Sequence, residues 1–150
     1  MRGLIRRAAV ASDALAGAGQ SLGGAPGHLY WANANNGTIA AVPLAGGTVT
    51  RLADLVDAPY GVAVIGDRII WANQGDGTID EAPLTGGGRP DTLIHGQDFP
   101  AGVAVDSGHI YWADQGDNTI DEAPLAGGAV TTLVPESPGS PGATGVAVGP

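Results

Sequence analysis

Two pairs of adjacent carboxylates are the most conspicuous groups in this sequence that could do chemistry. They are Asp80-Glu81 and Asp121-Glu122, and both stand in the context Thr-Ile-Asp-Glu-Ala-Pro-Leu. Neighbouring carboxylates can share general acid and base roles or hold a cation. Successive residues of a strand point to opposite faces, however, so the members of a pair cannot both reach one substrate without a bulge. We therefore expect all four on outer strand edges, where charge discourages aggregation, with an acidic rim that binds a cation or a basic partner as the functional alternative.

Other reactive groupings do not match known site patterns. Asp114, Asp117 and Asp121 lie close together, but their spacing fails the calcium-loop pattern, and a hairpin turn explains the Asp117-Asn118 dipeptide. No serine has the setting of a nucleophile elbow, and the absence of cysteine removes thiolate chemistry. Two of the three histidines precede the same aromatic box and the third stands apart, so a three-histidine metal site is not expected. We predict no catalytic residue, no metal site and no cofactor.

The charge of the chain argues against one class of partner. The 150 residues include 15 acids, six arginines and no lysine, for a net charge of −9. Three arginines lie in the first seven residues, so residues 8–150 carry 3 arginines against 15 acids, or −12. Such a surface repels phosphate backbones, so nucleic acid is not expected, whereas cationic groups or basic protein patches suit it. No apolar run approaches the roughly 20 residues of a membrane span, and none is predicted.

The first 21 residues differ from the rest of the chain. They are rich in Ala and Gly, contain no aromatic residue, and place a short apolar stretch after Arg6-Arg7. Asp13 interrupts that stretch, so the resemblance to a secretion signal is weak. We predict a leader over residues 1–21, weakly ordered or helical, and a folded region over residues 22–150.

The folded region repeats itself with a period of about 40 residues. Trp31, Trp71 and Trp112 occupy one column, with spacings of 71 − 31 = 40 and 112 − 71 = 41. Each copy continues with a turn dipeptide, a Thr-Ile strand that ends in Pro-Leu, a Gly-Gly turn, a third strand and a Gly-Val-Ala-Val strand. The dipeptides Asn36-Gly37, Asp76-Gly77 and Asp117-Asn118 tolerate the positive φ that a type I′ hairpin requires. Four short strands per copy predict an all-β fold of propeller blades, each with four antiparallel strands.

The tryptophans and the small residues fit this geometry. Innermost strands crowd the axis of a propeller, which suits Gly-Val-Ala-Val, and an indole ring can fill the wider space between blades. We therefore expect each tryptophan to pack between neighbouring blades rather than to bind a ligand.

The Tyr-Trp-Ala-Asn/Asp box, the Pro-Leu-x-Gly-Gly turn and the Pro-x-Gly-Val-Ala-Val strand resemble the YWTD β-propeller family of LDL-receptor class B repeats, in its bacterial form. The resemblance covers residues 22–150. It implies a six-bladed propeller that serves as a protein-interaction or scaffold module, and it slightly favours a secreted or periplasmic location. The last residue of the box, which is Asn33, Asn73 or Asp114 here, helps to tie neighbouring blades by hydrogen bonds in that family. The third box position is Ala rather than Thr.

Three blades sweep about half of a six-bladed ring and leave two open edges. The residues ten positions before Trp31, Ser21–Gly24, make a poor opening strand, whereas Gly145–Val148 makes a good one that begins a fourth blade. One hypothesis is a homodimer in which each chain lends that last strand to the first blade of the other. The other is that the chain is a fragment of a longer propeller.

Two functions follow from the sequence. The first is a non-catalytic binding or scaffold module that presents a blade surface to a protein or a small ligand. The alternative is part of a metal-dependent propeller enzyme, of the kind that gluconolactonase-like hydrolases and virginiamycin B lyase represent. Asp67 and Asp106, which follow the inner strands, are among its few available ligands, and such a site needs several inward carboxylates or imidazoles.

Overall fold

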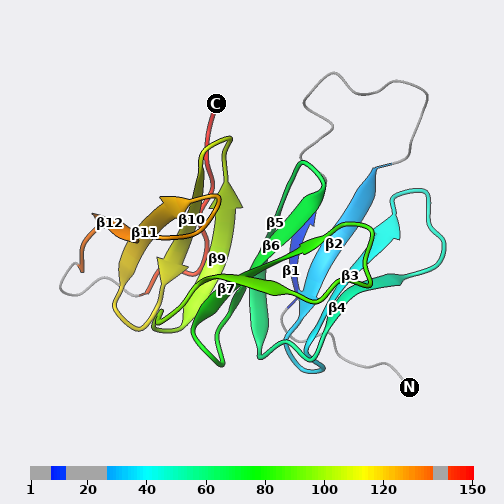
Figure 1. Ribbon diagram of the computed structural model, residues 1–150, viewed down its shortest axis with the longest axis horizontal. Helices are drawn as coiled ribbons and strands as arrows, with labels where there is room; N and C mark the ends of the chain where they lie inside the picture. The colour runs from blue at the N-terminus through cyan, green and yellow to red at the C-terminus, as the bar shows by residue number, and fades with distance from the viewer. Residues whose placement is uncertain (1–7, 13–26, 137–141) are drawn as a thin grey trace.

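The computed structural model describes residues 8–12, 27–136 and 142–150, and every regular element in these residues is a β-strand (Figure 1). The strands form three antiparallel sheets of four, which confirms the prediction of three propeller blades. None of the described residues forms a helix long and apolar enough to cross a membrane.

Each blade is a meander whose strands follow one another in chain order. Blade 1 contains β1 (Ala8–Ser12), β2 (His28–Asn33), β3 (Thr38–Pro43) and β4 (Thr50–Asp54). Blade 2 contains β5 (Pro59–Ile65), β6 (Arg68–Asn73), β7 (Thr78–Pro83) and β8 (Asp91–Ile94). Blade 3 contains β9 (Pro100–Val105), β10 (His109–Asp114), β11 (Thr119–Pro124) and β12 (Thr131–Val134).

The hairpin after each tryptophan turns on one residue with positive φ. Gly37, Gly77 and Asn118 have φ angles of 60°, 70° and 57°, as their residue types suggest. The residue before each of them has a negative φ. A type I′ turn needs two consecutive residues with positive φ, so the prediction of that turn is wrong. Four residues connect the strands instead, and in blade 2 the Gly77 amide donates to the Asn73 carbonyl at 3.1 Å.

The inner strand of blade 1 is β1, which lies inside the segment for which we predicted a weakly ordered or helical leader. β1 pairs with β2 and sets Val10 opposite Trp31, as Val62 lies opposite Trp71. The sequence search missed it because residues 13–27 separate β1 from β2, whereas Gly66-Asp67 alone separate the corresponding strands of blade 2. The proposed boundary at residue 22 stays a prediction, and Ser21–Gly24 lie outside the described residues.

Hydrophobic packing between blades holds the structure together. Trp71 lies in a core with residues of blade 1 such as Tyr30 and Ile39, and Trp112 lies in a second core with residues of blade 2 such as Ile70. Both indoles are fully buried, and burial of that much apolar surface is a large favourable term. Trp31 is only partly buried, because no described blade precedes blade 1. The expected packing role is therefore observed for two of the three tryptophans.

The innermost strands approach one another too closely for any side chain at one position. A Cβ atom on Gly61 would lie 2.5 Å from the carbonyl oxygen of Ala101 in the next inner strand. A Cβ atom on Gly102 would collide with Gly145, whose segment follows β9 along the molecule (Figure 1). Glycine in the Gly-Val-Ala-Val strand is therefore required by close backbone approach.

Candidate functional site

The structure does not bring the two acidic pairs together on one surface. Asp80 and Asp121 are 8% and 5% exposed and face the packing between blades. Glu81 and Glu122, on the opposite face of the same strands, are partly buried, and Glu81 pairs with Arg68 at 2.5 Å. The alternation of faces was predicted correctly, but no continuous acidic rim forms from these four residues. Their role in binding stays a prediction.

Asp80 belongs to a buried polar network in blade 2. The Asn73 amide donates to Asp80 Oδ2 at 2.6 Å and to Thr78 Oγ1 at 3.0 Å, and the Trp71 indole N–H donates to Asn73 Oδ1 at 2.9 Å. Burial raises the pKa of Asp80 above its ordinary value, although hydrogen bonds from Thr92, Asn73 and Thr78 oppose that shift. Asn73 thus ties its own blade together and positions the tryptophan.

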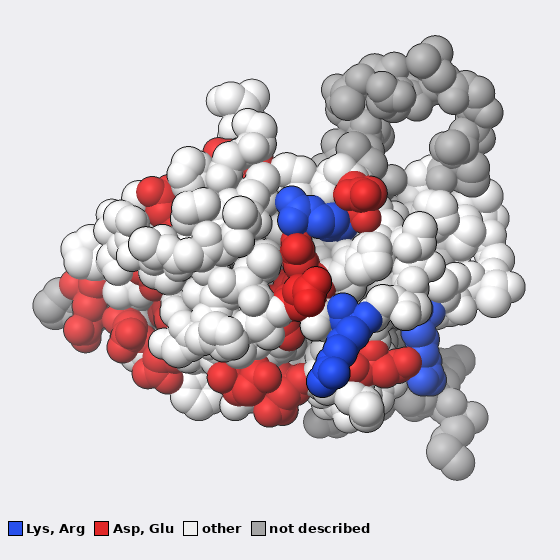
Figure 2. Space-filling model, viewed as in Figure 1, with Lys and Arg blue, Asp and Glu red and all other residues white. Residues whose placement is uncertain are grey.

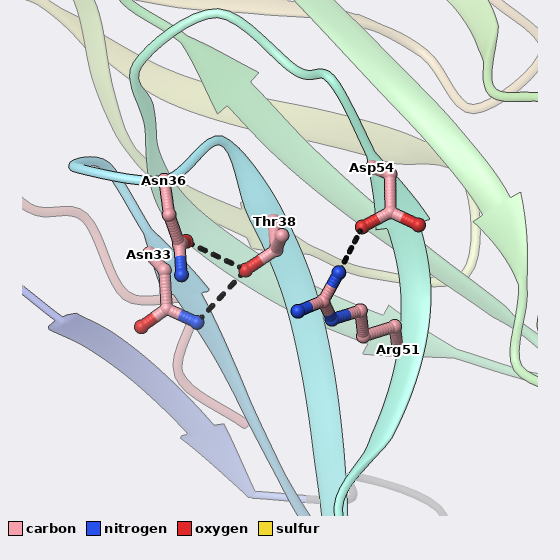
Figure 3. Close-up of polar contacts among 5 residues, drawn as sticks. All are labelled: Asn33, Asn36, Thr38, Arg51 and Asp54. Atoms are coloured by element: carbon pink, nitrogen blue, oxygen red, sulfur yellow. Dashed lines mark hydrogen bonds and ion pairs between the residues drawn. The ribbon is translucent and has the colours of Figure 1, made fainter.

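Blade 1 has a simpler version of this network. Asn33 Nδ2 donates to Thr38 Oγ1 at 3.0 Å, and the Thr38 hydroxyl donates to Asn36 Oδ1 at 2.8 Å (Figure 3). Ala40 stands opposite Trp31, where the other blades have aspartate, so no carboxylate is buried there. The Arg51–Asp54 pair in the same view is exposed, at 3.3 Å, and such pairs contribute little to stability.

Asp114 has a buried carboxyl group with a raised pKa. Its Oδ2 accepts a hydrogen bond at 3.1 Å from the amide of Asp98, in the connection between blades 2 and 3. Its Oδ1 is buried and has no hydrogen-bond partner. Burial is the main cause that raises the pKa of Asp114 to about 6, with contributions from Asp117, Asp121 and Asp98. The bond of Asp114 therefore reaches the loop that connects blades 2 and 3, whereas the bonds described for Asn33 and Asn73 stay within one blade. A role of these three residues in tying neighbouring blades stays a prediction.

Three glutamines form hydrogen bonds where blades 2 and 3 meet. Gln74 Nε2 donates to Gln115 Oε1 at 2.8 Å, and the Trp112 indole N–H donates to Gln97 Oε1 at 3.0 Å. Gln74 and Gln115 follow the box residue in their own copies, and Gln97 lies in the connecting loop, so a signal for these contacts was present in the repeat.

Five exposed aspartates lie at one end of the blades. This end is formed by the β2–β3, β6–β7 and β10–β11 turns and by the β4–β5 and β8–β9 loops, at the bottom of Figure 1. These segments contain no Arg or Lys. We call this surface the acidic end and define it by five exposed residues: Asp54, Asp57, Asp76, Asp98 and Asp117. Figure 2 shows acidic side chains along the lower margin of the molecule.

A pocket of about 430 Å³ opens between blades 1 and 2 at this end. Four of the residues that line it are aspartates, and one, Arg89, is a cation. The polar residues that line it are Asp54, Asp57, Asn73, Asp76, Asp80 and Arg89. The arrangement suits a positively charged group that can exchange water for carboxylate oxygens.

The ligands expected for a metalloenzyme lie at the other end of the blades, in short turns. Asp106 Oδ1 accepts from the amides of Gly108 and His109, and its Oδ2 accepts from the Tyr111 hydroxyl at 2.8 Å. These hydrogen bonds lower the pKa of Asp106 and fix the turn. Asp67 is exposed in the equivalent turn of blade 2. Among the described residues, no group of three or more Asp, Glu or His side chains has the geometry to hold a metal ion.

The acidic end was not predicted, because its carboxylates lie in different copies of the repeat and not in adjacent pairs. Asp57 and Asp98 each stand two residues before a repeated proline, and Asp76 and Asp117 occupy the same turn position. In a meander, alternate connections lie at the same end of the sheet, so four of the five carboxylates could have been grouped from the repeat alone.

Comparison with known proteins places the fold. No family model matches the sequence, and no curated protein matches it. A structure of a nidogen/laminin complex is similar to this chain, with a TM-score of 0.67 and 24% identity over 73% of this chain and 44% of that one. A virginiamycin B lyase from Staphylococcus aureus has a TM-score of 0.67 and 16% identity over 81% of this chain and 42% of that one.

A streptogramin B lyase structure is also similar, with a TM-score of 0.67 and 13% identity over 80% of this chain and 41% of that one. This chain therefore spans less than half the length of the structures it matches. The likeness covers 73% to 81% of this chain and agrees with the propeller expected from the repeats. In its fold, this chain consists of three blades of a β-propeller.

Proposed function

We propose that this chain is a non-catalytic binding module whose acidic end engages a cationic partner. The observation that carries the proposal is the convergence of four exposed aspartates from successive turns and loops without Arg or Lys, next to Asp54 at the end of β4 and a pocket lined by four aspartates and Arg89. Clustered charge of one sign accelerates association with the opposite charge and selects against anions.

The chemistry of the pocket favours an ammonium or guanidinium group on a protein surface. Asp54, Asp57 and Asp76 line the pocket with carboxylate oxygens, and Arg89 also lines it. Asp54 Oδ1 accepts from Arg51, and Asp76 Oδ1 accepts from the Thr78 hydroxyl. The nidogen/laminin structure is a complex between two proteins, and its likeness to this chain supports a protein partner.

The test compares two sets of neutralised carboxylates. The first variant replaces Asp57 and Asp76 by Asn, and the control replaces exposed Asp67 and Asp91, at the other end, by Asn, so that both variants lose two negative charges. Titration with an oligolysine peptide is expected to show at least a roughly tenfold weaker Kd for the first variant and less than about a twofold change for the control. Equal losses in both variants would refute the proposal, because they would report net charge alone.

The second candidate function is a lyase, and the observation in its favour is the similarity to the two lyase structures. In this reading the chain supplies three blades of a metal-dependent enzyme, with Asp67 and Asp106 near the inner strands. Elemental analysis of the purified chain tests it: a stoichiometric divalent ion that is lost on replacing Asp67 and Asp106 by Asn supports the enzyme.

A further inference from the structure

Leu55, in the loop between β4 and β5, has the most exposed large apolar side chain among the residues that the structure describes. It is 98% exposed, whereas its neighbour Val56 is 9% exposed and belongs to the core between blades 1 and 2. The Val56 amide donates to the Gly37 carbonyl at 3.2 Å, so the loop is bonded to the β2–β3 turn directly after Leu55. The backbone that carries Leu55 is therefore anchored, and its side chain points into solvent.

The backbone at Leu55 has a conformation that suits glycine. Its φ is 58°, in the left-handed region. Gly96 stands at the equivalent position of the next loop, four residues before Pro100 as Leu55 is before Pro59, and its φ is 74°. This conformation costs a leucine stability but costs a glycine none, and an apolar side chain in water returns no hydrophobic gain. Folding alone therefore does not explain a leucine at this position.

Leu55 borders two hollows at the acidic end, where blades 1 and 2 meet. It lines the pocket of about 430 Å³ together with Asp54 and Asp57. It also lines a pocket of about 460 Å³ together with residues of the β2–β3 turn such as Asn36. The first pocket reaches Asp80, which is 8% exposed and whose Oδ1 has no hydrogen-bond partner. An exposed apolar group beside carboxylates is complementary to a surface that carries apolar and basic groups side by side.

We propose that Leu55 is an apolar anchor for a segment of a partner protein in which aliphatic side chains stand next to lysine or arginine. The aliphatic groups of that segment pack on Leu55 and enter the hollows beside it, and its basic groups meet Asp57 and Asp76. Charge brings the partner to the acidic end, and the buried apolar contact supplies most of the affinity. This inference rests on the proposed function, to which it adds the apolar groups that the cationic partner carries.

Two peptides of equal length and charge measure the apolar contribution. One is Lys-Lys-Leu-Lys-Lys-Leu-Lys-Lys, and in the other serine replaces both leucines. We expect the wild type to bind the leucine peptide at least about tenfold more tightly than the serine peptide, because leucine is buried on both sides of the contact. Leu55→Asn is expected to lose most of that ratio and to keep the Kd of the serine peptide within about twofold.

Leu44→Asn is the matched control, because Leu44 is 65% exposed in the β3–β4 connection at the other end of blade 1. It is expected to keep the wild-type ratio. A wild-type ratio near one with binding of the serine peptide overturns the role of Leu55 and leaves the cationic site standing. A ratio that Leu55→Asn leaves unchanged, or that both variants lower equally, also overturns it. Absence of binding for both peptides overturns the proposed function and this inference with it.

Thermal unfolding separates a binding role of Leu55 from a structural one. Asparagine adopts left-handed conformations more readily than leucine, so Leu55→Asn is expected to raise the midpoint of unfolding by about 1 to 3 °C. Weaker binding of the leucine peptide by a chain of higher stability supports the anchor. A lower midpoint for Leu55→Asn would show that the leucine stabilises the loop and would overturn the proposal.

Discussion

Replacing Asp114 by Asn tests how blade 3 is joined to blade 2. The carboxyl group is only 2% exposed, one of its oxygens has no partner, and three further aspartates face it from the connecting loop, the β10–β11 turn and β11: Asp98, Asp117 and Asp121. Blades 1 and 2 already have asparagine at this position. In blade 2 that amide donates to the buried aspartate of the neighbouring strand, and an amide at residue 114 would have Asp121 as the same acceptor.

The size and sign of the effect follow from the raised pKa. Folding raises the pKa of Asp114 from 3.8 to about 6, so between these values the folded chain holds a proton that the unfolded chain releases. The free energy of unfolding therefore falls as pH rises, by at most about 1.4 kcal/mol per pH unit. The full contribution is about 3 kcal/mol, and screening at the acidic end reduces it, so Asp114→Asn is expected to stabilise the chain by about 1 to 3 kcal/mol above pH 6.

Urea unfolding at about pH 4 and about pH 7.5 measures this difference. We expect the variant and the wild type to have similar stability near pH 4, where Asp114 is protonated in the folded state, and the variant to be more stable near pH 7.5. Asp117→Asn, at an exposed position three residues away, is the control for general loss of negative charge. A stabilisation of equal size at both pH values, or one matched by the control, would refute the assignment of the effect to a buried carboxylate.

Three further predictions concern packing and charge. Trp71→Ala is expected to lower the free energy of unfolding by about 3 to 5 kcal/mol, and Trp31→Ala by about half of that, because only Trp71 is covered by a preceding blade. Unfolding in guanidinium chloride measures the two free energies. Gly61→Ala is expected to cost at least about 2 kcal/mol because its Cβ would press on Ala101, whereas Gly108→Ala, whose nearest neighbour is 3.7 Å away, is expected to cost under about 1 kcal/mol by the same assay. Arg68→Ala removes a partly exposed ion pair with Glu81 and is expected to lower stability by no more than about 1 kcal/mol, a loss that 0.5 M salt should reduce by roughly half.

The repeat accounts for how much of the fold could be predicted from the sequence. Trp31, Trp71 and Trp112 fall in one column, and a column of large apolar residues at constant spacing must face equivalent packing in every copy. The inner strand of blade 1 escaped because it is marked by small residues, Ala8–Ser12, which have no strong strand propensity and lie far from their partner in sequence. Pairing there is decided by the neighbouring blade and not by local preference.

The environment of each carboxylate could not be predicted in the same way. Asp80 and Glu81 are adjacent and chemically alike, yet one is buried among Asn73, Thr78 and Thr92 and the other reaches Arg68. Strand alternation predicts that they separate, but which of them faces inward depends on the register of β7 with β6, where Trp71 lies opposite Asp80. Register, in turn, is set by the hydrophobic face that each blade offers to the next.

Ionic strength tests whether charge drives recognition at the acidic end. The turns and loops that form this end contain no Arg or Lys, so attraction of a cationic partner to their aspartates is electrostatic. Binding of a cationic partner there weakens as salt is added, since its attraction is screened. An affinity for oligolysine that stays the same between low and high salt would contradict this origin of the binding.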